Sequence, residues 1–92
     1  MPEVHVRLRW PDGVVQRVYS PSLVVTERFD EGTAYPSEVL VPRLGEALAE
    51  ASERVRAAYG FPCSRAAASW QQVQARAADG GPGTVVVEAF EH

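Results

Sequence analysis

The sequence contains no lysine, a single cysteine, and no apolar run long enough to cross a bilayer. Its nine positive charges are therefore all arginine, which in a chain rich in alanine and valine is typical of GC-rich bacterial codon usage. One cysteine excludes an internal disulfide framework and fits a reducing cytoplasm. The first residues also lack the basic and apolar segments of a signal peptide. We therefore expect a cytoplasmic protein that does not insert into membranes.

Composition narrows the class further. The 92 residues are enough for one domain, which we assign to residues 1–92. The net charge of −3 argues against nucleic-acid binding, which needs a concentrated basic face. Histidine, cysteine and carboxylate side chains are nowhere clustered at the spacing of metal ligands. We therefore expect neither a metal nor another cofactor.

The first twenty residues predict a β-hairpin. Apolar and polar side chains alternate over residues 4–10, as in a strand with one buried and one solvated face. A Pro-Asp-Gly turn follows at 11–13, because proline presets φ and glycine accepts a positive φ. Residues 14–19 then form the returning strand.

A long amphipathic helix is predicted from about residue 37 to 59. Its apolar side chains recur at intervals of three and four residues. They are Leu40, Leu44, Leu48, Ala51, Val55 and Ala58. Gly60 can take the left-handed conformation that ends a helix, Phe61 can pack back on the last turn, and Pro62 cannot continue the helix. Pro42 either belongs to the first turn or kinks the helix.

The remaining elements complete an α+β fold. Residues 21–28 fit a short helix or a third strand, and we favour the helix. A second long helix is expected at 65–78 and a final strand at 84–90. We predict a three-stranded, mainly antiparallel sheet made of the N-terminal hairpin and the C-terminal strand. Two main helices and the short connecting helix cover one face.

Few residues suggest reaction chemistry. Cys63 lies just before a helix start, where free N–H groups and the nearby Arg65 would favour a thiolate. No base accompanies it, so a small buried residue is the simpler interpretation. Ser20 and Ser22 could bind an anion at a helix start, although capping explains them more economically. Ser64 can cap the second helix.

Three arginines form a candidate surface for a partner. Arg7, Arg9 and Arg17 would share the polar face of the hairpin and could receive a partner's carboxylate. A solvated face balanced by nearby acids is the simpler interpretation. Glu88 and Glu91 do not read as a catalytic pair.

Several blocks resemble a small bacterial family of nitrogen starvation response proteins. They are Arg-Trp-Pro-Asp-Gly at 9–13, Tyr-Ser-Pro-Ser at 19–22, and the stretch from 51 to 64. In that family the gene lies in a cluster with a nitrilase, a radical SAM protein, an acetyltransferase-like protein and a flavoprotein. The cluster is associated with scavenging nitrogen from nitriles or cyanide. The resemblance implies a role in that pathway, but no catalytic residues.

These observations favour a non-catalytic accessory protein that binds a protein from the same cluster. The hairpin edge and the bend at residues 60–64 are the candidate contact surfaces. The alternative is a small-molecule binder or enzyme that uses Cys63 near the turn at 20–22; a sensor of a nitrogen metabolite is a third hypothesis. An open sheet edge would also allow two copies to pair as a homodimer.

Overall fold

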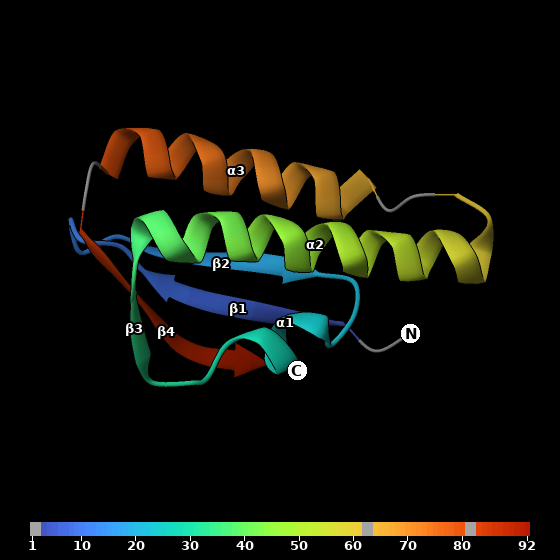
Figure 1. The fold of residues 1–92 in the computed structure, drawn as a ribbon, viewed down its shortest axis with the longest axis horizontal. Helices are drawn as coiled ribbons and strands as arrows, with labels where there is room; N and C mark the ends of the chain where they lie inside the picture. The colour runs from blue at the N-terminus through green and yellow to red at the C-terminus, as the bar shows by residue number, and fades with distance from the viewer. Residues whose placement is uncertain (1–2, 62–63, 81–82) are drawn as a thin grey trace.

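A computed structural model describes residues 3–61, 64–80 and 83–92. Its elements follow one another as β1 (Val4–Arg9), β2 (Val15–Ser20), α1 (Val24–Arg28), β3 (Thr33–Pro36), α2 (Ser37–Tyr59), α3 (Ser64–Gly80) and β4 (Thr84–Glu91). The strands form one antiparallel sheet in the order β2-β1-β4-β3. Helices α2 and α3 lie side by side over one face of this sheet (Figure 1). None of the described helices has the length and apolarity that a membrane span requires.

The hairpin of β1 and β2 forms as the alternation predicts. The backbone N–H of Gly13 donates to Trp10 O at 2.8 Å, and Gly13 adopts a φ of 87° that glycine accepts without strain. Val4, Val6 and Leu8 of β1 are 0–1% exposed and face the helices. They join aliphatic side chains from α1, α2 and β4 in a single core.

The sheet has four strands, not the three that we predicted. The additional strand, β3, pairs with β4 from Thr33 opposite Val87 to Pro36 opposite Thr84. We predicted no strand for these four residues. Pairing with β4 gives them their strand conformation, and β4 is consequently a central strand, as its β-branched residues indicated.

The short segment after β2 is a helix, as we favoured over a third strand. It begins at Val24, three residues later than a serine cap at Ser20 would place it, and Leu23 is its N-cap residue. Ser22 still contributes, since its Oγ accepts a hydrogen bond from the Val24 N–H at 3.3 Å. Val24 and Val25 are fully buried and fix α1 against the core.

The two long helices end where the sequence predicts, to within two residues. Helix α2 stops at Gly60, whose φ of 88° is left-handed and whose N–H donates to Arg56 O at 2.7 Å. Pro42 lies inside α2, in its second turn and exposed to solvent. Helix α3 starts at Ser64 itself, so this serine is a helical residue and not the cap before it.

Candidate functional site

The C-terminal part of α2 extends past the sheet. The helix has 23 residues, and at about 1.5 Å per residue it is roughly 35 Å long. The six residues of β1 or β2 extend over only about 20 Å. In Figure 1 the last turns of α2 and the first turn of α3 project beyond the ends of the strands. We call residues 53–61 the overhang.

The overhang carries the two most exposed large hydrophobic side chains in the described part of the chain. Tyr59 is 57% exposed and Phe61 is 67% exposed. Phe61 therefore does not pack back on the last turn of α2, and that prediction is wrong. The sheet ends before the overhang begins, so it offers these rings no apolar surface. Exposed aromatic rings at a projecting tip are typical of a contact surface for another protein.

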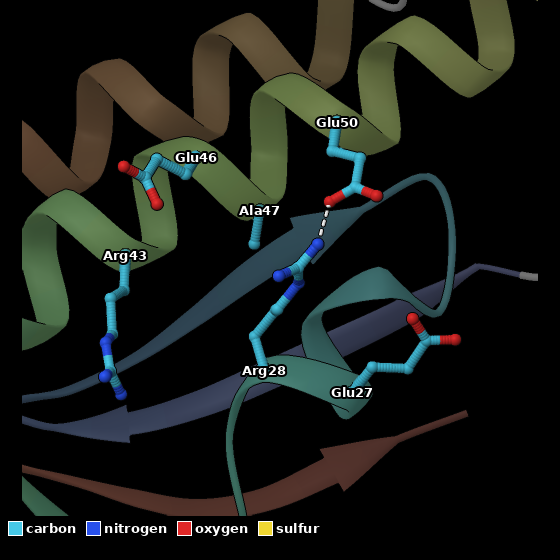
Figure 2. A pocket seen from close by; sticks show the side chains of 6 residues that line it. All are labelled: Glu27, Arg28, Arg43, Glu46, Ala47 and Glu50. Atoms are coloured by element: carbon cyan, nitrogen blue, oxygen red, sulfur yellow. Dashed lines mark hydrogen bonds and ion pairs between the residues drawn. The ribbon is translucent and has the colours of Figure 1, made fainter.

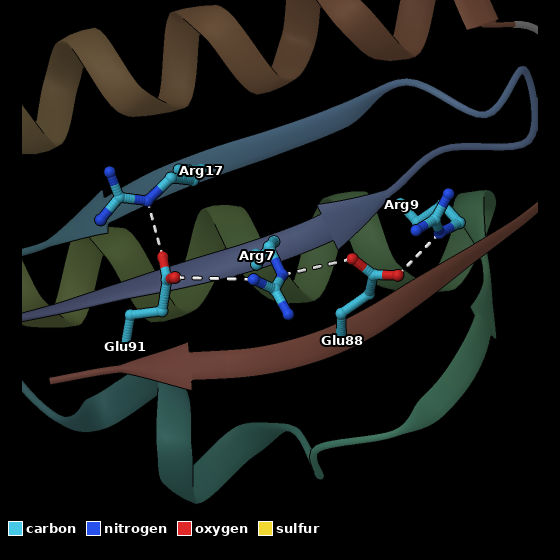
Figure 3. Close-up of polar contacts among 5 residues, drawn as sticks. All are labelled: Arg7, Arg9, Arg17, Glu88 and Glu91. Carbon is cyan, nitrogen blue, oxygen red and sulfur yellow. Dashed lines mark hydrogen bonds and ion pairs between the residues drawn. The ribbon is translucent and has the colours of Figure 1, made fainter.

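The face of the sheet opposite the helices carries a chain of alternating charges (Figure 3). We call it the open face. Arg9 Nε donates to Glu88 Oε2 at 2.6 Å, and Arg17 Nε donates to Glu91 Oε1 at the same distance. Arg7 lies between the two glutamates, with Nε 3.3 Å from Glu88 Oε1 and Nη1 3.7 Å from Glu91 Oε2. The Arg7 contacts are ion pairs without hydrogen-bond geometry.

A β-bulge brings both glutamates to the open face. Leu8 pairs with Val87 and Arg7 pairs with Ala89, so Glu88 is an extra residue in β4. In a regular strand, residues 88 and 91 would point to opposite faces because side chains alternate. The bulge shifts this alternation, and both carboxylates reach the arginines of β1 and β2.

These contacts stabilise the charged form of Glu91. The hydrogen bond from Arg17 is the largest cause, and the positive charges of Arg17, Arg7 and His5 act in the same direction. Together they hold the pKa of the Glu91 carboxyl below its ordinary value of 4.5. The Glu91 side chain is therefore a carboxylate at neutral pH.

A hollow of about 430 Å³ lies between α1 and α2 (Figure 2). Its lining consists of Glu27, Arg28, Arg43, Glu46, Ala47 and Glu50. Arg28 reaches across it and donates to Glu50, whereas Arg43 and Glu46 point away from each other. Because these charged groups do not converge, the hollow does not define a ligand site.

A second hollow, of about 240 Å³, lies on the outer side of the α2–α3 contact. At Gly45 helix α2 lies very close to Trp70 of α3: a Cβ at this position would lie 2.7 Å from the Trp70 ring. The absent side chain allows α2 and α3 to pack around the indole. This groove is a consequence of helix packing.

The serines before α1 serve the local backbone. Ser20 and Ser22 are 0% and 3% exposed. The Ser20 hydroxyl donates to Ser22 O at 2.7 Å, and the Ser22 hydroxyl accepts from Val24 as described above. Both hydroxyls are thus bonded to the local backbone. The structure gives no support to the hypothesis that Ser20 and Ser22 bind an anion.

A comparison with protein families identifies the chain. The family model of NitG, the nitrogen starvation-induced protein, matches residues 5–90. The chain belongs to the NitG family. The resemblance seen in the sequence is therefore confirmed as to family, and the match extends through α3 and β4, where the resemblance was weaker. Neither the curated proteins nor the solved structures gave a match.

The structure places the predicted site residues of this NitG family member in three separate regions. Arg7, Arg9 and Arg17 share the open face, as predicted. Arg65, at the start of α3, lies 3.8 Å above the ring of Tyr19 on β2 and 3.9 Å from a Glu3 carboxylate oxygen. Ser20 and Ser22 are in the turn before α1. The candidate thiol at residue 63 lies outside the described residues, whereas Ser64 is exposed.

Sequence reasoning anticipated acids beside the arginines of the open face but did not identify them as Glu88 and Glu91, and it missed the exposure of the overhang. In a regular strand Glu88 and Glu91 would lie on opposite faces, because side chains alternate with a period of two. The exposure of Tyr59 and Phe61 could have been anticipated from lengths alone, since a helix of 23 residues is much longer than a strand of six. No group of three potential metal ligands occurs among residues 3–61, 64–80 and 83–92.

Proposed function

We propose that this chain is a non-catalytic accessory protein of the nitrogen-starvation response, and that it acts by binding a partner protein through the overhang. The observation that carries the proposal is the exposure of Tyr59 and Phe61, at 57% and 67%, on helix ends that the sheet does not support. Aromatic side chains contribute much of the binding energy at protein interfaces when a partner covers them.

The partner that we propose is an enzyme encoded in the same gene cluster. The NitG family description supports a role under nitrogen starvation. The cluster that the family resemblance implies contains a nitrilase, a radical SAM protein, an acetyltransferase-like protein and a flavoprotein. An accessory protein of this kind would position, stabilise or regulate one of these enzymes.

Binding assays with the purified cluster enzymes test this proposal. A double variant, Tyr59→Ser with Phe61→Ser, removes both exposed rings and little buried surface. Val39→Ser is the matched control, because Val39 is a hydrophobic side chain on the same helix that is 38% exposed. We expect one enzyme to bind the wild type, and the double variant to bind about 100-fold more weakly, since each ring is a candidate hot spot.

The control should bind like the wild type. Failure of all four enzymes to bind the wild type would remove the proposed partner class. Equal binding of the wild type and the double variant would remove the overhang as the contact surface. Circular dichroism of each variant verifies that the helices are retained.

A further inference from the structure

The open face differs in charge from the rest of the molecule. It has three arginines and two glutamates, Glu88 and Glu91. The other six arginines of the chain are accompanied by ten aspartates and glutamates. A locally positive surface on an acidic protein attracts an anionic partner and orients it during encounter.

The ion pairs leave the outer ends of two arginines available. Arg9 and Arg17 each contact a glutamate through Nε alone. Among the residues that the structure describes, their terminal Nη1 and Nη2 groups have no partner, and the two side chains are 52% and 58% exposed. In Figure 3 the guanidinium end of Arg17 extends away from Glu91. The pair Nη1 and Nη2 can hold both oxygens of a carboxylate.

The glutamates also hold these arginines in place. A free arginine side chain loses rotamer freedom when it binds a ligand, and that loss weakens binding. Glu88 and Glu91 already restrict Arg9 and Arg17 at the Nε end. The bulge in β4 is the feature that positions both carboxylates for this purpose.

The spacing of the two arginines matches that of alternate residues in an extended chain. Arg17 lies opposite Arg7, so Arg9 is its diagonal neighbour on β1. Such diagonal positions are about 7–8 Å apart, and residues i and i+2 of an extended chain are about 7 Å apart. In Figure 3 the guanidinium groups lie farther apart than these backbone positions, at the two ends of the charge chain. A segment with glutamates at i and i+2 therefore reaches both arginines when its two side chains diverge.

We propose that the open face binds an extended acidic segment of a partner protein, with alternate carboxylates held by Arg9 and Arg17. Nucleic acid is a poor fit, because Glu88 and Glu91 would face the closely spaced phosphates and the face has an excess of only one positive charge. This surface lies on the sheet and not on the overhang, so the inference is independent of the proposed function.

The peptide Gly-Thr-Glu-Thr-Glu-Thr-Gly-amide, labelled with fluorescein at its N-terminal amine, is the direct probe. Its control has glutamine at both acidic positions, and a second control has the two glutamates adjacent, so that they point to opposite sides of an extended chain. In fluorescence anisotropy at low salt, we expect the alternating peptide to bind at least about tenfold more tightly than either control. Its affinity should fall as salt is raised, because screening weakens exposed charge contacts.

Variants of the protein identify the site. Arg9→Gln and Arg17→Gln should each weaken binding of the alternating peptide by about fivefold or more, in line with charge-assisted bonds. Arg28→Gln is the matched control, since Arg28 is also exposed and paired with a glutamate but lies on α1, outside both proposed surfaces. The double variant Tyr59→Ser/Phe61→Ser should bind the peptide like the wild type. This last comparison distinguishes a failure of peptide binding at the open face from a failure of partner binding at the overhang.

Three outcomes would overturn the inference. They are the absence of binding by the alternating peptide at low salt, equal binding of the glutamine peptide, and equal loss in Arg28→Gln and Arg17→Gln. Thermal unfolding of each variant confirms that the compared proteins are folded.

Discussion

The two parts of α2 have the same apolar pattern but different surroundings. In residues 37–51, the side chains of Leu40, Leu44 and Leu48 are 1–2% exposed because the sheet and α1 lie beneath them. In residues 52–59 no side chain is fully buried, although Val55 and Ala58 continue the same stripe. The difference shows that a helix period predicts which residues share a face, whereas the length of the sheet decides which of them are buried.

Residues 37–51, the supported part of α2, should therefore contribute most of the stability of this helix. The overhang should contribute to partner binding. The described ion pairs of the overhang, Glu53–Arg56 and Arg54–Glu50, both lie within α2. An exposed pair of this kind contributes little to stability. A segment with few buried contacts can bind a partner even though it adds little to the free energy of unfolding.

Replacing one aliphatic residue in each part tests this contrast most strongly. Leu44→Ala removes a side chain that is 1% exposed, and we expect the free energy of unfolding to fall by about 2–5 kcal/mol. Val55→Ala should lower it by less than about 1 kcal/mol, because alanine's better helix propensity offsets the small loss of burial. Urea unfolding measures both values. Similar losses in the two variants would show that the overhang is part of the cooperative core.

The helices and the hairpin could be predicted from the sequence because their signals are local. Alternation in residues 4–10, the Pro-Asp-Gly turn and the stop at Gly60 each act within a few residues. Strand β3 could not be predicted, since its four residues become a strand only by pairing with β4, about 50 positions later. Long-range pairing overrides the local preference in such short segments.

The candidate sites were predictable to a similar extent. The shared face of Arg7, Arg9 and Arg17 follows from strand alternation. Their acidic partners do not, because the bulge at Glu88 changes the register of β4 and no local pattern encodes it. The aromatic residues of the overhang were visible in the sequence, but their exposure depends on where the sheet ends.

A substitution of intermediate effect lies at the contact between α2 and α3. In Gly45→Ala, the new Cβ would meet the Trp70 ring at 2.7 Å. Overpacking of this kind costs about 1–3 kcal/mol, against a gain of about 1 kcal/mol in helix propensity. We expect a net loss of about 1 kcal/mol, measured by urea unfolding.

The same substitution in a Trp70→Leu background separates the two contributions. Without the indole there is no close contact, so Gly45→Ala should then stabilise the protein through helix propensity by up to about 1 kcal/mol. A loss of equal size in both backgrounds would show that the indole is not the cause. The sign change therefore tests the packing of α3 on the supported part of α2.

The smallest expected effect is the pH-dependent stability that two exposed glutamates, Glu91 and Glu53, contribute. Hydrogen bonds from arginine lower the pKa of Glu91 on the open face and of Glu53 on the overhang below 4.5. A lowered folded-state pKa adds stability above the unfolded pKa, and this contribution is lost as pH falls through the folded pKa. Glu91→Gln should thus destabilise the protein slightly at neutral pH, and this effect should disappear as the pH falls through the folded-state pKa of the wild-type carboxyl.

Glu53→Gln should have an even smaller effect at neutral pH. Its partner, Arg56, is three residues away and remains close in residual helix of the unfolded chain, whereas Arg17 and Glu91 are 74 positions apart and separate on unfolding. Carbon-detected NMR titration measures both carboxyl pKa values, and Arg17→Gln should raise that of Glu91 alone. If Arg17→Gln left the pKa of Glu91 unchanged, the ion pair would not form in solution, and the open face would lack the ordered arginine on which acidic peptide binding depends.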